Sequence, residues 1–147
     1  MLQKLHPLFI CALLIALGVV NTFAYAPYQY SFMPLLTLPV LALAIWQAQS
    51  PKQAAWFGWS YGIGWFGLGV SWVHVSIATF GGMPLVFSLG IMAALVAYLA
   101  LFPALAAWLA ARFGRNTVIA FPVAFTLAWV ISENLRSWLF TGFPWLS

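Results

Sequence analysis

Long apolar stretches that contain almost no charge dominate this sequence and restrict what it can fold into. A transmembrane helix needs about 20 mostly apolar residues, and lipid forces such a stretch to be helical because no water is present to hydrogen-bond its backbone. The pattern therefore predicts an all-α, polytopic integral membrane helix bundle with about five transmembrane helices, forming one transmembrane domain over residues 1–147. The predicted spans run from about Leu8 to Ala24, Phe32 to Ala48, Ala54 to Val73, Leu85 to Ala111 and Thr117 to Ile131.

The composition indicates lipid surroundings as well. Hydrophobic residues make up 65% of the chain and charged residues 4%, whereas soluble domains carry about 25% charged residues. The basic side chains are scattered between apolar stretches and form no basic cluster, so we expect no nucleic-acid partner.

The positive charges predict the orientation of the helices. Lys4 precedes the first apolar stretch, Lys52 lies between the second and third, and Arg112 and Arg115 lie between the fourth and fifth. If every stretch crosses once, these residues share one side of the membrane, and the positive-inside rule places that side and the N-terminus in the cytoplasm. Residues 71–84 and the segment that begins at Glu133 then reach the outer face.

A cleavable secretory signal is the alternative interpretation of the N-terminus. Lys4, the apolar stretch after it and Ala24-Tyr25-Ala26 resemble such a signal. Pro27 would directly follow the cut, however, and the apolar stretch exceeds the usual signal core of about 7–15 residues. We therefore interpret this stretch as a retained transmembrane helix.

Few side chains could perform chemistry. Glu133 is the only carboxylate side chain, which excludes carboxylate pairs and carboxylate metal cages, and a single cysteine excludes an internal disulfide. We expect Cys11, in the first apolar stretch, to be an inert small apolar residue. His74 lies near Ser71 and Ser76, but the spacing supplies neither an orienting group nor an oxyanion site. We therefore expect no catalytic residue, no metal site and no cofactor.

Two local patterns have both a structural and a functional interpretation. Glu133 and Arg136 are three positions apart on one helical face, which favours a salt bridge at a helix end, although an ionisable pair in a membrane helix is also a functional candidate. Gly58 and Gly62, extended by Gly69, favour close helix packing, and a groove for a lipid tail is the alternative. Tryptophans in the third span fit either an interfacial belt or an apolar wall.

Three sequence motifs carry a resemblance to a known family. SWVHVSIATFGGMP at 71–84, FAYAPY at 23–28 and ENLRSWLFTGFPWL at 133–146, in this order around the glycine-rich third span, resemble the membrane part of bacterial apolipoprotein N-acyltransferases. The similarity covers essentially the whole chain. His74 departs from the family pattern, in which tyrosine is more common.

The resemblance implies a function in lipoprotein biosynthesis at the bacterial inner membrane. It implies an eight-helix membrane domain that carries a periplasmic nitrilase-like domain with a catalytic Glu-Lys-Cys set. The cysteine takes an acyl chain from a phospholipid as a thioester and passes it to the amine of a diacylglyceryl-cysteine lipoprotein, which divides one difficult step into two. No position of this chain matches that catalytic set, so we expect an N-terminal fragment of an enzyme that is inactive alone. Its partners would be membrane phospholipid, the lipoprotein and the missing C-terminal part.

The resemblance also implies that the outer segments position lipid and lipoprotein substrates. Gly81 and Gly82 predict a turn, and Pro84 suits the first turn of the next helix; an ordinary interfacial loop is the alternative. A small non-enzymatic membrane protein, such as a transporter subunit or an assembly factor, is the rival function, although ionisable groups within the spans are scarce. The candidate positioning residues are Trp72, His74, Phe80, Gly81, Gly82, Glu133, Arg136, Gly142, Phe143 and Trp145.

Overall fold

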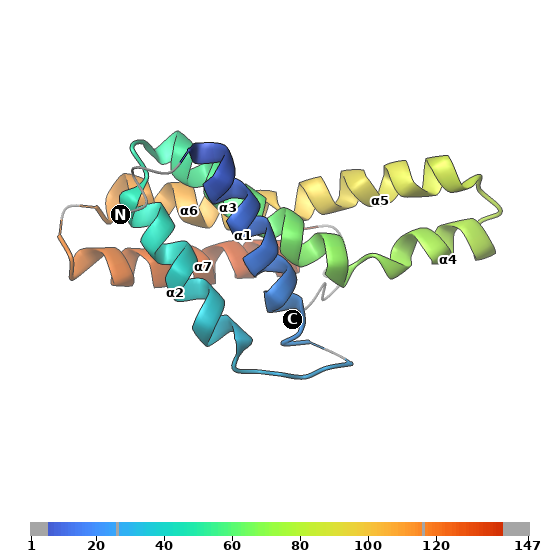
Figure 1. Ribbon diagram of the computed structural model, residues 1–147, viewed down its shortest axis with the longest axis horizontal. Coiled ribbons are helices and arrows are strands. Elements are labelled where there is room, and N and C mark those ends of the chain that lie inside the picture. The colour runs from blue at the N-terminus through green and yellow to red at the C-terminus, as the bar shows by residue number, and fades with distance from the viewer. Residues whose placement is uncertain (1–5, 26, 116, 140–147) are drawn as a thin grey trace.

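The computed structural model describes residues 6–25, 27–115 and 117–139, and this part of the chain is helical without any strand. The predicted all-α class is therefore confirmed for the described residues. Figure 1 shows an elongated bundle from which two helices, α4 and α5, extend side by side as an antiparallel hairpin. The helices are α1 (Pro7–Thr22), α2 (Met33–Gln47), α3 (Pro51–Gly69), α4 (Trp72–Phe80), α5 (Leu85–Leu99), α6 (Leu101–Phe113) and α7 (Ala120–Trp138).

The predicted spans match these helices in order, but two boundaries were wrong. The segment after Val73 is not a loop: α4 continues as a helix to Phe80, and only residues 81–84 separate it from α5. The segment after Ile131 is also helical, since α7 extends to Trp138. Both segments contain polar residues that the apolar pattern excluded from the spans, yet neither contains a residue that stops a helix.

Length and apolarity identify fewer membrane-crossing helices than the sequence predicts. Among the described residues, α5 and α6 together form one 29-residue helix, Leu85–Phe113, that is long and apolar enough to cross a membrane. The helices α3 and α4, bent by 49° at their junction, form a second candidate if they are counted as one span. The helices α1 and α2 are apolar but only 16 and 15 residues long, short of the usual 20 or so. The number of about five transmembrane helices therefore stays a prediction.

Each of the two long helices is interrupted for a local chemical reason. Pro103 has no backbone N–H, so the carbonyl of Leu99 receives no helical hydrogen bond at the boundary of α5 and α6. The bend between α3 and α4 follows Gly69 and includes Ser71, and glycine and serine are common at helix kinks.

Glycines allow α3 to pack closely against a helix on each side. A Cβ atom added to Gly58 would collide with the backbone of α6 at Pro103, and one added to Gly62 would collide with Ala100, which lies between α5 and α6. On the other side, a Cβ atom on Gly64 would collide with the carbonyl oxygen of Ile15 in α1. The predicted packing role of Gly58 and Gly62 is confirmed, and α3 is the central helix of the bundle.

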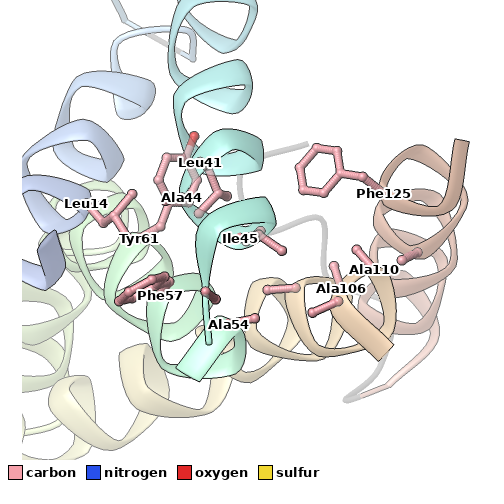
Figure 2. Packing of buried hydrophobic residues seen from close by; sticks show 14 of the residues in the cluster. Leu14, Leu41, Ala44, Ile45, Ala54, Phe57, Tyr61, Ala106, Ala110 and Phe125 are labelled. Atoms are coloured by element: carbon pink, nitrogen blue, oxygen red, sulfur yellow. The ribbon is translucent and has the colours of Figure 1, made fainter. Parts of the chain in front are cut away.

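The core around α3 combines large apolar side chains with a few hydrogen bonds between helices. In Figure 2, Tyr61 and Phe57 of α3 lie between side chains of α1 and α2. The hydroxyl of Thr37 on α2 lies 3.0 Å from both Asn21 Oδ1 and Tyr61 Oη, and all three residues are buried. These contacts connect α1, α2 and α3 through hydrogen bonds within the core.

The helices alternate in direction, which places the cationic residues at one end of the bundle. Lys52 lies in the first turn of α3, and Arg112 in the last turn of α6. Because Gly58 contacts Pro103 and Gly62 contacts Ala100, these two helices are antiparallel, so both cations lie at the same end. We call it the cationic end.

Candidate functional site

A buried arginine lies near the opposite end of α3. The side chain of Arg136, on α7, is 5% exposed, and its Nη2 donates to Glu133 Oε2 at 2.5 Å. The predicted pairing of these two residues is therefore present. The Cζ atom of Arg136 lies 5.7 Å from the ring centroid of Trp65 and 5.4 Å from that of Phe66, both on α3. One carboxylate and two aromatic faces thus surround a charge that would be costly to bury alone.

The carboxylate of the pair keeps one oxygen available. Glu133 Oε1 is buried and has no hydrogen-bond partner in the described part of the chain, and the same holds for the indole nitrogen Nε1 of Trp65. The site therefore combines an acceptor in Glu133 with a donor in Trp65. Guanidinium groups bind phosphate, carboxylate and carbonyl oxygens, whereas a carboxylate oxygen accepts from an amine or amide N–H.

Aromatic side chains from three segments enclose this pair. Trp65 stacks with Phe66, with centroids 4.6 Å apart, and with Trp129 of α7 at 6.2 Å. Tyr25, just beyond the end of α1, stacks on Trp65 at 5.9 Å. We call Tyr25, Trp65, Phe66 and Trp129, together with the pair Glu133–Arg136, the aromatic–arginine cluster.

Tyr25 is electrostatically linked to the ion pair. Burial raises the pKa of its phenol from 10.0 to about 12, the charge of Glu133 raises it further and that of Arg136 opposes this shift. At neutral pH the phenol is therefore a neutral hydrogen-bonding group beside the two charges.

Five of the other predicted site residues lie on the α4–α5 hairpin, which extends from the bundle (Figure 1). Trp72 is 54% exposed and Phe80 is 89% exposed, and α4 has no buried residue. His74 is half-buried, and its Nδ1 contacts the carbonyl oxygen of Ser71 within the same turn. The neighbouring hydroxyls of this stretch form no catalytic arrangement with this imidazole.

The hairpin turn has the backbone that its glycines predict, with one difference. Gly82 has φ +63°, a left-handed conformation that favours glycine, whereas Gly81 has φ −88°. A Cβ atom on Gly81 would instead lie 2.6 Å from the carbonyl oxygen of Ile77. Pro84 precedes the first helical residue of α5 and caps that helix. Glycine is thus favoured at position 81 because a side chain would collide with the carbonyl of Ile77, and at position 82 because the backbone is left-handed.

The structure separates the predicted residues into two groups. Arg136 contacts the last turn of α3, directly before the bend, whereas Gly81 and Gly82 lie beyond the full length of α4. Nine helical residues extend about 13 Å, so the glycine turn and the ion pair occupy opposite ends of this helix. Gly142, Phe143 and Trp145 lie outside the described residues.

Sequence reasoning missed the aromatic half of the cluster. Tyr25 belongs to the FAYAPY motif and Trp65 to the tryptophans of the third span, but nothing local indicates that they stack on each other or that Trp65 contacts α7. Within the described ranges, no three His, Cys, Asp or Glu side chains come together as a metal site would require. Cys11 is half-buried and lies beside Gln49 and Gln53 at the cationic end, away from the cluster.

Comparison with known proteins identifies the family. The model of the apolipoprotein N-acyltransferase N-terminal domain matches residues 17–147. An apolipoprotein N-acyltransferase from Vibrio vulnificus is 48% identical over 130 residues, which cover 88% of this chain and 26% of the relative. Its counterpart from Methylococcus capsulatus is 46% identical over 138 residues, covering 92% of this chain and 27% of the relative.

The chain therefore belongs to the apolipoprotein N-acyltransferase N-terminal domain family. It spans about a quarter of the length of these curated relatives. The resemblance predicted from the three motifs is confirmed.

Proposed function

We propose that this chain is the N-terminal membrane-embedded part of an apolipoprotein N-acyltransferase and that it positions substrates for acyl transfer. In this proposal about five helices cross the bacterial inner membrane, and the N-terminus lies in the cytoplasm. Family membership supports the activity. The apolar outer surface supports the membrane location: Val86 on α5 and Val130 on α7, for example, are 79% and 51% exposed.

The single observation that carries the positioning role is the aromatic–arginine cluster. The charged pair lies at the outer end of the bundle, near the base of the α4–α5 hairpin. Arg136 is buried, Glu133 is partly exposed, and one carboxylate oxygen has no partner among the described residues. Arg136 would attract the phosphate or ester oxygens of a phospholipid, and Glu133 Oε1 would accept from the amine or first amide of the lipoprotein. Both substrates would thereby present their reacting groups at one level of the membrane.

The hairpin would direct acyl chains toward this cluster. Its exposed apolar side chains, such as Trp72 and Phe80, extend the apolar surface beyond the bend of α3. An acyl chain that follows this surface stays in an apolar environment while its head reaches Arg136. Positioning of this kind accelerates a reaction because it removes the entropic cost of bringing the reactants together.

The reaction itself would use groups that this chain does not supply. A cysteine thiolate of the nitrilase-like domain attacks the ester carbonyl of the phospholipid and releases the lysophospholipid alcohol, which takes up a proton. The α-amine of the lipoprotein then attacks the thioester, and the thiol leaves as an amide forms. The proposed contribution of this chain is binding and orientation.

The test joins this chain to the C-terminal region of a relative and measures N-acylation. This chain is joined to the C-terminal remainder of the Vibrio vulnificus relative, in cells depleted of their own enzyme, and the mass of a reporter lipoprotein shows whether its N-terminus is acylated. We expect acylation with the chimera, and about 100-fold less with Arg136→Gln, since a lost charge-assisted contact costs about 1.5–3 kcal/mol. Arg115→Gln removes the same charge at the cationic end and is the matched control.

Several outcomes distinguish the parts of this proposal. Full acylation by Arg136→Gln and by Glu133→Gln would show that the aromatic–arginine cluster has no role in acyl transfer. Full acylation after residues 77–83 and 141–145 are scrambled together would show the same for the outer motifs. A chimera that folds but never acylates would contradict the proposed activity and favour the non-enzymatic alternative.

A further inference from the structure

An apolar cavity lies on the outside of the bundle, between α3 and α6. Its volume is about 340 Å³, within the range of about 300–1,000 Å³ that is typical of small-molecule sites. Its lining is apolar apart from a single lysine. We call it the tryptophan groove; it is lined by Lys52, Ala55, Trp56 and Trp59 of α3 and by Leu101, Ala104 and Trp108 of α6.

The groove follows from the spacing of these residues along two antiparallel helices. On each helix the lining positions recur every three or four residues, so they form one stripe about 10 Å long. Ala55 and Ala104 are the small residues of the two stripes, and the indoles of Trp56, which is 61% exposed, and Trp108 are the large ones. The indole nitrogen Nε1 of Trp59 donates to the carbonyl oxygen of Ala97 at 3.3 Å, which fixes one wall.

Two cations lie at one end of this apolar stripe. Lys52 lines the groove directly. Arg112 is one helical turn beyond Trp108, and its Cζ atom lies 5.4 Å from the ring centroid of Phe113, which itself packs edge-on against Trp108 at 6.4 Å. The groove therefore has an apolar length and a positively charged end.

We propose that the tryptophan groove binds an acidic membrane phospholipid, with one acyl chain along the apolar stripe and its phosphate at Lys52 and Arg112. Charge complementarity selects this occupant, because an apolar chain that ends in an anion matches both parts of the groove. Indole rings and basic side chains are also the residues that anchor proteins at the level of lipid headgroups. A transmembrane helix of another chain would bring no anion to the cationic end.

This site is separate from the aromatic–arginine cluster. Trp56 and Phe66 are ten residues apart on α3, which corresponds to about 15 Å along the helix axis, and the cations of the groove lie at the opposite end of the bundle from Arg136. The bound lipid would be a structural ligand of the cytoplasmic leaflet and not an acyl donor. The inference rests on the proposed function only for the location in a bilayer and for the orientation that places the cationic end in the cytoplasm.

The test measures which lipids stay bound to the chain. The protein in nanodiscs of phosphatidylglycerol and phosphatidylethanolamine is released into the gas phase, and native mass spectrometry counts the retained lipids. We expect preferential retention of phosphatidylglycerol, and about tenfold less in the Lys52→Gln/Arg112→Gln variant, because each basic residue attracts the anionic phosphate. Arg115→Gln is the matched control, and Ala104→Phe should lower retention by filling the groove without changing the charge.

A photo-crosslinking residue in place of Trp56, which is 61% exposed, identifies the occupant directly. A phosphatidylglycerol adduct supports the proposal, whereas an adduct with a peptide of another helix overturns it. Equal retention of both lipids by the wild type and the double variant also overturns the proposal. Displacement of phosphatidylglycerol by excess inorganic phosphate would overturn it as well, because it would indicate a site for the free ion. None of these measurements depends on acyl transfer, so they stand even if the chimera is inactive.

Discussion

The body of the bundle and the α4–α5 hairpin have similar apolar sequences but very different surroundings. In the body, α3 contributes nine buried residues, from Ala54 to Phe66, whereas α4 contributes none. Glycines on α3 contact the backbones of α1 and α6, whereas the glycine of α5, Gly90, has nothing within 4 Å of where a Cβ atom would lie.

This difference concerns stability. Side chains that are packed within the bundle contribute most to its stability, whereas the exposed side chains of the hairpin contribute little. The aromatic–arginine cluster lies where the two regions meet, and it combines a buried arginine with a carboxylate that is partly exposed.

The largest expected difference is between two phenylalanines. Phe57 is 3% exposed within the core and Phe80 is 89% exposed on the hairpin. We expect Phe57→Ala to lower the free energy of unfolding by about 3–5 kcal/mol, because the lost ring leaves a cavity, and Phe80→Ala to change it by less than about 0.5 kcal/mol. Reversible unfolding in mixed micelles, followed by circular dichroism, measures both. Equal losses would mean that the hairpin is part of the core.

The next difference is between two glycines. Gly64→Ala forces a Cβ atom against the carbonyl of Ile15, and such overpacking costs about 1–3 kcal/mol. Gly90→Ala meets no atoms and should stabilise α5 by about 0.5–1 kcal/mol, since alanine favours the helix. The same unfolding measurement applies, and a tolerated Gly64→Ala would show that α1 and α3 are farther apart than described.

A smaller effect concerns the polar contacts of the core. Thr37→Val removes the hydroxyl that contacts Asn21 and Tyr61, and hydrogen bonds between membrane helices contribute about 0.6–1.7 kcal/mol. Thr79→Val is the matched control, because Thr79 is exposed on α4. We expect about 1 kcal/mol of destabilisation from the first substitution and none from the second; the reverse order would assign the stabilising contacts to the hairpin.

The smallest expected effect is a pH dependence of stability at the border of the two regions. The pKa of Tyr25 is raised from 10.0 to about 12 in the folded protein, so the unfolded chain loses this proton first as the pH rises. The contribution of Tyr25 is therefore complete below pH 10 and decreases between pH 10 and about 12. Compared with Tyr25→Phe, the wild type should lose stability over this interval.

The control for this measurement is Tyr28→Phe, in the same connection, where the tyrosine is 54% exposed. Parallel stability curves for the wild type and Tyr25→Phe from pH 9 to 12 would contradict the packing of Tyr25 against Trp65.

Local sequence patterns predicted most of the helical elements and one contact of the site. The apolar stretches correspond in order to the helices, and the spacing of Glu133 and Arg136 predicted their salt bridge, because both features depend on residues within a few turns. The apolar pattern did not predict that α4 and the end of α7 are helical, because polar residues such as His74 and Asn134 lie within these helices. Polarity indicates solvent or headgroup exposure, but it does not by itself end a helix.

The sequence by itself determined that the chain is helical and apolar and, through its motifs, to which family it belongs, since helical hydrogen bonds form within one segment and apolar side chains favour lipid. Only the tertiary structure decided that Tyr25, Trp65 and Arg136 meet, and that Lys52 and Arg112 share one end of a groove. These residues lie on different helices, and the close packing of Gly58, Gly62 and Gly64 sets which faces touch. Contacts between helices depend on the shapes of both surfaces, and no single segment contains that information.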